Sequence, residues 1–172
     1  MQPEARSERT VAARAHPLAE LLQCPPGTGE LLNGAAQCIA VQMGEIVFRQ
    51  SEACRGLYVV ISGQYLRRTE RLETRLTLGV ARTGDLVELA AVLGDGRHTY
   101  TLCAQTDGSV LLLPMEALRL AFEAYPRLRM QLLEELAREV SRGYDASCQN
   151  RAPRVQRRSG GAQVGKQAGL HI

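Results

Sequence analysis

Two charged residues near the middle of the chain have the types and the spacing of a phosphate-binding site. Glu88 heads a short apolar run within residues 84–104, and Arg97 follows it nine positions later. An arginine guanidinium makes charge-assisted hydrogen bonds to phosphate, worth about 1.5–3 kcal/mol. Backbone N–H groups at the start of a short helix also favour an anion. The segment therefore predicts a site for a small anionic ligand.

Other kinds of chemistry find little support in the residues. Residues 24–34 have the glycines of an ATPase phosphate loop, but Gly29 is followed by Glu30 and Leu31. That loop requires a lysine and a hydroxyl residue there, so we interpret this segment as a turn. No Ser/His/Asp or Cys/His constellation is visible, and we predict that the protein is not an enzyme.

The cysteines and the apolar runs indicate the compartment. The five cysteines are Cys24, Cys38, Cys54, Cys103 and Cys148. They are scattered and form no CxxC pair, so we predict no metal site and a reducing environment. The polar N-terminus does not have the pattern of a signal peptide, and no run of 18 apolar residues occurs. We expect a cytoplasmic protein with no membrane partner.

Positive charge is concentrated at the C-terminal end. Residues 1–150 carry 16 Arg and 18 acidic residues, whereas residues 151–172 carry four Arg, one Lys and no acidic residue. A basic segment with little periodicity is expected to be disordered, and it can attract nucleic acid by charge alone. An inert solvated tail is the simpler interpretation.

The middle of the chain has the pattern of a β-rich domain. Short alternating or β-branched runs are separated by turn-like glycines between residues 36 and 113, as in a sandwich or barrel. The runs lie at 37–43, 45–50, 56–63, 64–70, 74–81, 97–105 and 109–114.

A long helix is predicted to begin at Pro126, because proline is favourable at a first helical position. Leu128, Leu132, Leu136 and Val140 recur every four residues along it. The apolar arc is broader than a single core contact needs, so we predict that these residues form a seam between two copies of the chain.

These patterns divide the chain into four parts. We expect a flexible N-terminus at 1–16, a β-barrel domain with an initial helical part at 17–125, a long helix at 126–148, and a disordered basic tail at 149–172.

The order of these features resembles the cyclic-nucleotide-binding domain, and more closely the sensory domain of Crp/Fnr-type transcription regulators. The resemblance covers residues 17–148 and rests on 43–64, on the GDLVELAAV segment and on the Arg97 region. It implies a mainly β fold with flanking helices, namely a double-stranded β-helix or jelly-roll barrel followed by a long C-terminal dimerisation helix.

The resemblance also implies roles for residues of the segment around Glu88. Arg97 would hold a cyclic phosphate and Glu88 would meet the ribose, while Leu89 and Ala90 would begin a helical turn. Two positions depart from the family pattern: Val87 stands where the family has a glycine, and His98 stands where it has a small residue. We interpret His98 as an ordinary loop or strand histidine. The predicted ligand-binding residues are Leu86, Val87, Glu88, Leu89, Arg97, His98 and Thr99.

The resemblance thus implies a homodimeric sensor that binds a small anionic effector, such as cAMP or cGMP, and transmits binding through the dimer helix. Family members continue into a DNA-binding helix-turn-helix, whereas the 22 residues after Asn150 contain no recognisable one. We therefore expect a sensory domain without its DNA-binding module. Such a domain would act on DNA only through that missing module, or by pairing with a full-length regulator. Two alternatives stay open: a ligand-free dimerisation module, and a DNA-binding protein that acts through its basic tail.

Overall fold

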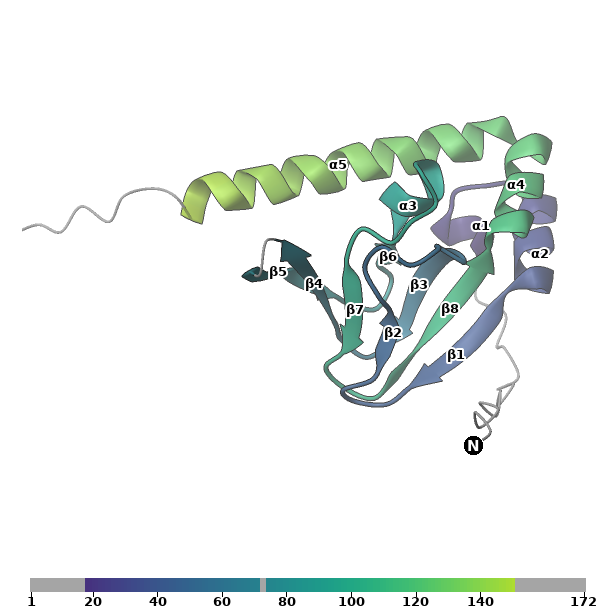
Figure 1. Ribbon diagram of the computed structural model, residues 1–172. Helices are drawn as coiled ribbons and strands as arrows, with labels where there is room; N and C mark the ends of the chain where they lie inside the picture. Colours follow the sequence, from purple (N-terminus) through teal and green to yellow (C-terminus); the bar gives the residue numbers. More distant parts are fainter. Residues whose placement is uncertain (1–17, 72–73, 151–172) are drawn as a thin grey trace, which may run out of the picture.

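The strands form two four-stranded sheets that together make a jelly-roll barrel (Figure 1). The computed structural model describes residues 18–71 and 74–150. All strand pairs are antiparallel, in the orders β1-β8-β3-β6 and β2-β7-β4-β5. The strands are β1 Gln37–Val41, β2 Ile46–Phe48, β3 Gly56–Ser62, β4 Tyr65–Arg71, β5 Thr74–Ala81, β6 Leu86–Val87, β7 Thr101–Ala104 and β8 Gly108–Pro114.

Helices cover one end and one side of this barrel. In Figure 1, α1, α2 and α4 gather at one end, and α5 passes over α3 toward β4 and β5. The helices are α1 Leu18–Leu21, α2 Pro26–Ala35, α3 Leu89–Leu93, α4 Met115–Ala124 and α5 Pro126–Asn150. The predicted fold class is confirmed: a mainly β jelly roll with flanking helices and a long C-terminal helix.

Strand β3 shows how the sequence divides the core into two parts. Side chains of a strand alternate between its two faces. Leu57 and Val59 accordingly pack in the cluster beneath the helices, whereas Tyr58 and Val60 pack inside the barrel. All four are almost completely buried, which explains why this strand has a continuous apolar sequence rather than an alternating one.

Helix α2 corrects the interpretation of residues 24–34 as a turn. Pro26 occupies the start of the helix, where its missing N–H costs nothing. Gly29 is required by close packing, since a Cβ at that position would lie 2.7 Å from the Cβ of Ala19. Leu32 is fully buried in the core. Gly29 therefore serves the contact between α1 and α2.

Helix α5 is anchored to the barrel by its first turns. Leu128 and Leu132 are buried in the same cluster as Leu89 of α3. Beyond them the helix extends across the side of the barrel (Figure 1). The helix continues to Asn150, two residues past its predicted end at residue 148. The predicted N-terminus at 1–16 and the segment 151–172 lie outside the described residues.

No helix within the described part of the chain is both long enough and apolar enough to cross a membrane.

Candidate functional site

Glu88 occupies an unusual backbone position between β6 and α3. Its φ of 76° and ψ of 29° lie in the left-handed region, which non-glycine residues adopt only when their surroundings hold them there. Its N–H donates to the hydroxyl of Tyr100 at 3.3 Å. Val87, just before it, lies in β6 with ordinary strand pairing to Tyr58. Leu89 begins α3, so the helical turn expected there is present.

The carboxylate of Glu88 is turned into the protein. Its side chain is fully buried, and its oxygens accept hydrogen bonds from Thr99, at 3.3 Å from the backbone N–H and 3.4 Å from the hydroxyl. The Nδ1 atom of His98 lies 3.5 Å from Oε2. These contacts engage both carboxylate oxygens within the chain.

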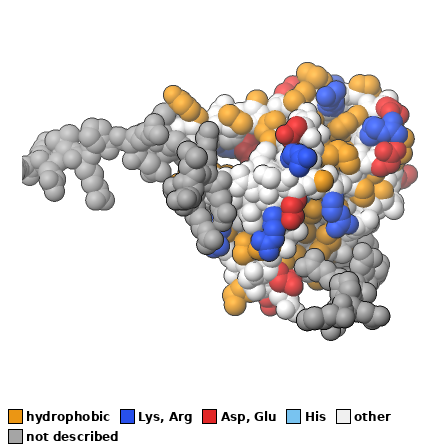
Figure 2. Space-filling model, viewed as in Figure 1, with side chains coloured by type: hydrophobic (Ala, Val, Ile, Leu, Met, Phe, Trp, Pro, Cys, Tyr) orange, Lys and Arg blue, Asp and Glu red, His pale blue; other side chains and the backbone are white. Residues whose placement is uncertain are grey.

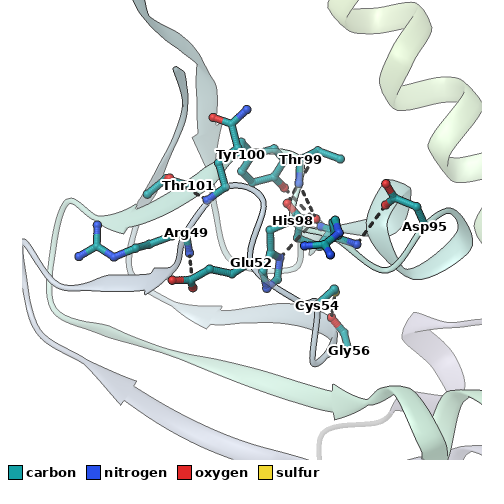
Figure 3. Close-up of polar contacts among 12 residues, drawn as sticks. Arg49, Glu52, Cys54, Gly56, Asp95, His98, Thr99, Tyr100 and Thr101 are labelled. Carbon is teal, nitrogen blue, oxygen red and sulfur yellow. Dashed lines mark hydrogen bonds and ion pairs between the residues drawn. The ribbon is translucent and has the colours of Figure 1, made fainter. Parts of the chain in front are cut away.

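His98 is the residue that the structure places beside Glu88. It is 3% exposed, and its ring stacks on Phe48 with centroids 3.9 Å apart and planes at 7°. Figure 3 shows His98 with Thr99 and Cys54 around it. Burial alone would lower the pKa of this histidine, but Cys54 and Glu88 beside the ring outweigh that effect and raise the pKa to about 9.

Arg97 points in another direction. Its side chain is exposed, and its Nη1 donates to the backbone carbonyl of Ser51 at 3.0 Å. A bridge between Ala53 and Arg97 fixes the local register, so residue 97 faces outward and residue 98 inward. The structure therefore does not bring Arg97 and Glu88 together, and the phosphate-holding role of Arg97 stays a prediction without support from its position.

A cavity of about 1030 Å³ lies between the barrel and α5. Strands β4 to β6 and helix α3 form one wall, and α5 forms the other. Leu86 and Leu89, both in the predicted ligand-binding set, contribute to the wall on the barrel side. Glu88, Arg97 and His98 are not part of the lining, and neither is Thr99.

Arg67 of β4 supplies the positive charge on the barrel wall of this cavity. Its Nη1 lies 2.6 Å from Oε1 of Glu139 on α5. Its guanidinium carbon lies 5.7 Å from the ring centroid of Tyr100, in a cation–π contact. Its Nε is buried and has no hydrogen-bond partner among the described residues. Local pattern does not single out Arg67, because it is one of several charged residues in the same short strand.

The residues predicted to form a dimer seam lie on different sides of α5. Leu128 and Leu132 are buried within this chain, and Leu136 packs partly against the same core. Of the predicted set, Val140 is exposed, at 63%. Leu128 and Leu132 are therefore unavailable to a second copy.

A different set of apolar residues lies on the outer side of α5. Its members are all exposed and alternate at spacings of three and four positions, which is the heptad spacing of a coiled-coil seam. This exposed stripe consists of Met130, Leu133, Ala137, Val140 and Tyr144. Figure 2 shows hydrophobic side chains at the surface of the helical part of the molecule.

Comparison with known proteins agrees with this architecture. Residues 38–125, just over half of the chain, match the family described as "Cyclic nucleotide-binding domain", which confirms the resemblance noted in the sequence. A search of curated protein sequences finds no match.

Three solved structures illustrate the likeness of fold. The catabolite activator protein of Thermus thermophilus is 24% identical with a TM-score of 0.64, over 78% of this chain and 62% of that one. The sensor domain of the transcriptional regulator DNR from Pseudomonas aeruginosa is 22% identical with a TM-score of 0.63, over 77% and 88%. A cyclic nucleotide-binding domain from Methylobacillus flagellatus is 12% identical with a TM-score of 0.67, over 82% and 86%. The chain thus spans about three fifths of the Thermus protein.

Proposed function

Because the chain belongs to the cyclic nucleotide-binding domain family, we propose that it is the effector-binding domain of a Crp/Fnr-type transcription regulator. In this proposal a small anionic effector, such as cAMP or cGMP, binds between the barrel domain at 17–125 and the long helix at 126–148. Binding changes how the helix packs on the barrel, and a homodimer transmits that change.

The observation that carries the proposal is the cavity between the barrel and α5. Its volume of about 1030 Å³ lies at the upper end of the range of about 300–1,000 Å³ that is usual for ligand pockets. Leu86 and Leu89 supply apolar surface on one wall, and Glu135 and Glu139 belong to the other. A ligand in this cavity touches barrel and helix at once, so it can bias their arrangement.

Arg67 supplies the contact to an anion. Its buried Nε–H has no partner among the described residues, so a phosphate oxygen would satisfy a donor that is otherwise costly. A phosphate on the guanidinium would also compete with the carboxylate of Glu139. Effector binding would then break the ion pair between Arg67 on the barrel and Glu139 on α5. The effector would thus bind one arrangement of barrel and helix better than the other, and so shift the population toward it.

The exposed stripe of α5 supports the homodimer. Leu133, Val140 and Tyr144 are 39%, 63% and 70% exposed, although all three are apolar or aromatic. Pairing with the same stripe of a second copy buries these residues, as in a two-stranded coiled coil. The stripe continues from the turns that pack on the barrel, so movement of α5 there reaches the dimer contact directly.

A ligand-free dimerisation module is the second candidate, and the arrangement at Glu88 favours it. The Glu88 carboxylate is occupied by Thr99 and faces His98, and Arg97 is bonded to the carbonyl of Ser51. Both charged groups thus make contacts within the chain at the positions where the family resemblance implies contacts to a cyclic nucleotide.

Isothermal titration calorimetry with cAMP and cGMP separates the two candidates. If the effector site is as proposed, one nucleotide binds, and Arg67→Met weakens it about 10-fold to 100-fold, the equivalent of a lost charge-assisted hydrogen bond. Arg97→Met is the matched control and leaves the affinity unchanged. Absence of binding at high micromolar concentration favours the dimerisation module. Loss of binding in Arg97→Met but not in Arg67→Met contradicts the proposed site.

A further inference from the structure

Three side chains that carry metal-binding atoms meet beside the barrel core. Cys54 lies in the loop between β2 and β3, Glu88 joins β6 to α3, and His98 precedes β7. One ligand atom from each, namely a thiol sulfur, a carboxylate oxygen and an imidazole nitrogen, lies within 4.8 Å of the other two. Far apart in the sequence, these donors have no recognisable motif, which is why the scattered cysteines predicted no metal site.

We propose that Cys54, Glu88 and His98 bind a divalent cation of the zinc type. Thiolate, imidazole and carboxylate are the three protein ligands that Zn²⁺ uses, at about 2.0–2.3 Å from the metal. Ligand atoms around such a tetrahedral ion lie about 3.5 Å apart. The three ligand atoms, which lie within 4.8 Å of one another, therefore need to approach by up to about 1 Å when an ion binds. The fourth position stays open to water or to another small ligand.

The imidazole of His98 is an independent sign that a partner belongs at this point. The residue is 3% exposed, and its Nδ1 has no hydrogen bond among the described residues. Oε2 of Glu88 lies 3.5 Å from that atom, which is too long for a good hydrogen bond. Buried polar atoms in native proteins are nearly always satisfied. A metal ion on this nitrogen would satisfy it.

The backbone around the three residues is held in place by short hydrogen bonds. The N–H of Cys54 donates to the carbonyl of Gly96 at 2.7 Å, and the N–H of His98 donates to the carbonyl of Glu52 at 2.9 Å. These bonds join the loop that carries the cysteine to the segment that carries the histidine. Two of the three ligands are thus fixed relative to each other before any ion binds, which lowers the cost of binding.

A second set of contacts orients the ligand side chains. Thr99 donates from both its N–H and its hydroxyl to the carboxylate of Glu88. Phe48 stacks on the His98 ring and fixes its plane. Metal ligands in proteins are typically oriented by such outer contacts, which contribute to affinity.

Charge and access are also consistent with a divalent ion. One thiolate and one carboxylate together balance a 2+ charge, so the loaded site is neutral in a place where Glu88 and His98 are almost fully buried. Cys54 is half-buried and its thiol now donates to the carbonyl of Gly56 at 3.3 Å. The cysteine is thus the most exposed of the three ligands.

Titration of the full chain with Co²⁺ tests the proposal, because a thiolate bound to Co²⁺ gives a charge-transfer band in the near ultraviolet. We expect one Co²⁺ per chain, displaced by Zn²⁺, and a loss of the band in Cys54→Ser with affinity at least about 100-fold weaker. Cys103→Ser is the matched control: Cys103 is also half-buried and reduced, and its thiol also lies near a backbone carbonyl, that of Gly44, at 3.6 Å. This variant should bind as the wild type does.

Cys54→Ser changes one atom, so a fold check by circular dichroism accompanies it, and Glu88→Gln provides a second variant with little change in volume. Both should lose the ion and keep the fold. The proposal is overturned if the wild type shows no band at millimolar Co²⁺, or if the band survives in Cys54→Ser and so belongs to other thiols. No cyclic nucleotide is present in this titration, so its result does not depend on the proposed effector.

Discussion

Arg67 and Glu139 tie the barrel to the long helix through an ion pair of 2.6 Å between Nη1 and Oε1. The two side chains are 17% and 31% exposed, so solvent screens the pair only in part. Glu139 lies past the turns of α5 that are anchored in the core. The pair therefore holds a part of the helix that hydrophobic packing holds less firmly.

Removal of this tie should loosen the second half of α5. We expect Glu139→Gln to lower the free energy of unfolding by no more than about 1 kcal/mol, and to speed amide hydrogen exchange in α5 beyond Leu136. Arg138→Gln is the control, since within the described part of the chain Arg138 pairs only with Glu134 and Glu135 of its own helix. Equal exchange in both variants would show that the pair does not restrain the helix.

Two buried tyrosines should respond in opposite ways to loss of their hydroxyl. The hydroxyl of Tyr65 is buried without a hydrogen-bond partner among the described residues, whereas that of Tyr100 accepts the N–H of Glu88. We expect Tyr65→Phe to be neutral or stabilising by up to about 1 kcal/mol, and Tyr100→Phe to cost about 1–3 kcal/mol. Urea unfolding measures both, and the opposite order would contradict the contacts described for these rings.

Burial raises the pKa of Tyr58 and of Tyr65 to about 12. In the unfolded chain both phenols titrate near pH 10. The folded chain therefore holds these protons more tightly, and their contribution to stability is complete below about pH 10 and is lost as the pH rises through about 12. We expect tyrosinate absorbance from these residues only near pH 12, together with alkaline unfolding. Tyr58→Phe should remove part of that late absorbance. A full tyrosine titration below pH 11 with the fold intact would contradict the prediction.

His98 and Arg97 should differ strongly in their effect on stability. His98 is stacked on Phe48 and faces Glu88, so His98→Gln removes a packed ring from the core and leaves a buried carboxylate with one partner fewer. We expect a loss of about 2–4 kcal/mol. Arg97→Gln removes one exposed contact to a carbonyl and should change stability by less than about 0.5 kcal/mol. Thermal and urea unfolding of the two variants provide the comparison.

The contrast between these neighbours shows how far the sequence alone predicts the site. The strand at Thr74–Ala81 followed from local pattern, and the start of α3 at Leu89 followed from the family resemblance. Local pattern did not predict which of Arg97 and His98 faces the protein interior. A shift of one residue in register exchanges the two faces of a strand. The register is set by the bridge between Ala53 and Arg97, a contact between segments distant in sequence.

The same reason explains the other differences. Arg67 faces the cavity only because α5 lies across β4, and that relation has no local signal. Leu128 and Leu132 pack in the core of this chain. Periodicity alone does not distinguish such core residues from residues of a dimer seam. The fold class could be predicted from composition and from the periodicity of apolar residues. The role of each side chain depends on how segments distant in the sequence pack together.

The exposed stripe of α5 is the surface that we expect to join two copies of the chain. Leu133 and Val140 occupy the same seam position in consecutive heptads and are 39% and 63% exposed. A glutamate at either position places an unpaired charge in a two-stranded seam, so we expect Leu133→Glu and Val140→Glu each to weaken a homodimer at least about 10-fold. Neither change removes a core residue of the single chain.

Ser141→Glu is the matched control for these variants. Ser141 is exposed, adjacent to Val140 and off the stripe, and it receives the same new charge on the same helix. Sedimentation velocity across a concentration series measures the monomer–dimer equilibrium of all three proteins. Dimers that persist in both stripe variants would place the contact elsewhere on the molecule. A dissociation as large in Ser141→Glu would show that added helix charge, and not a buried seam, is responsible.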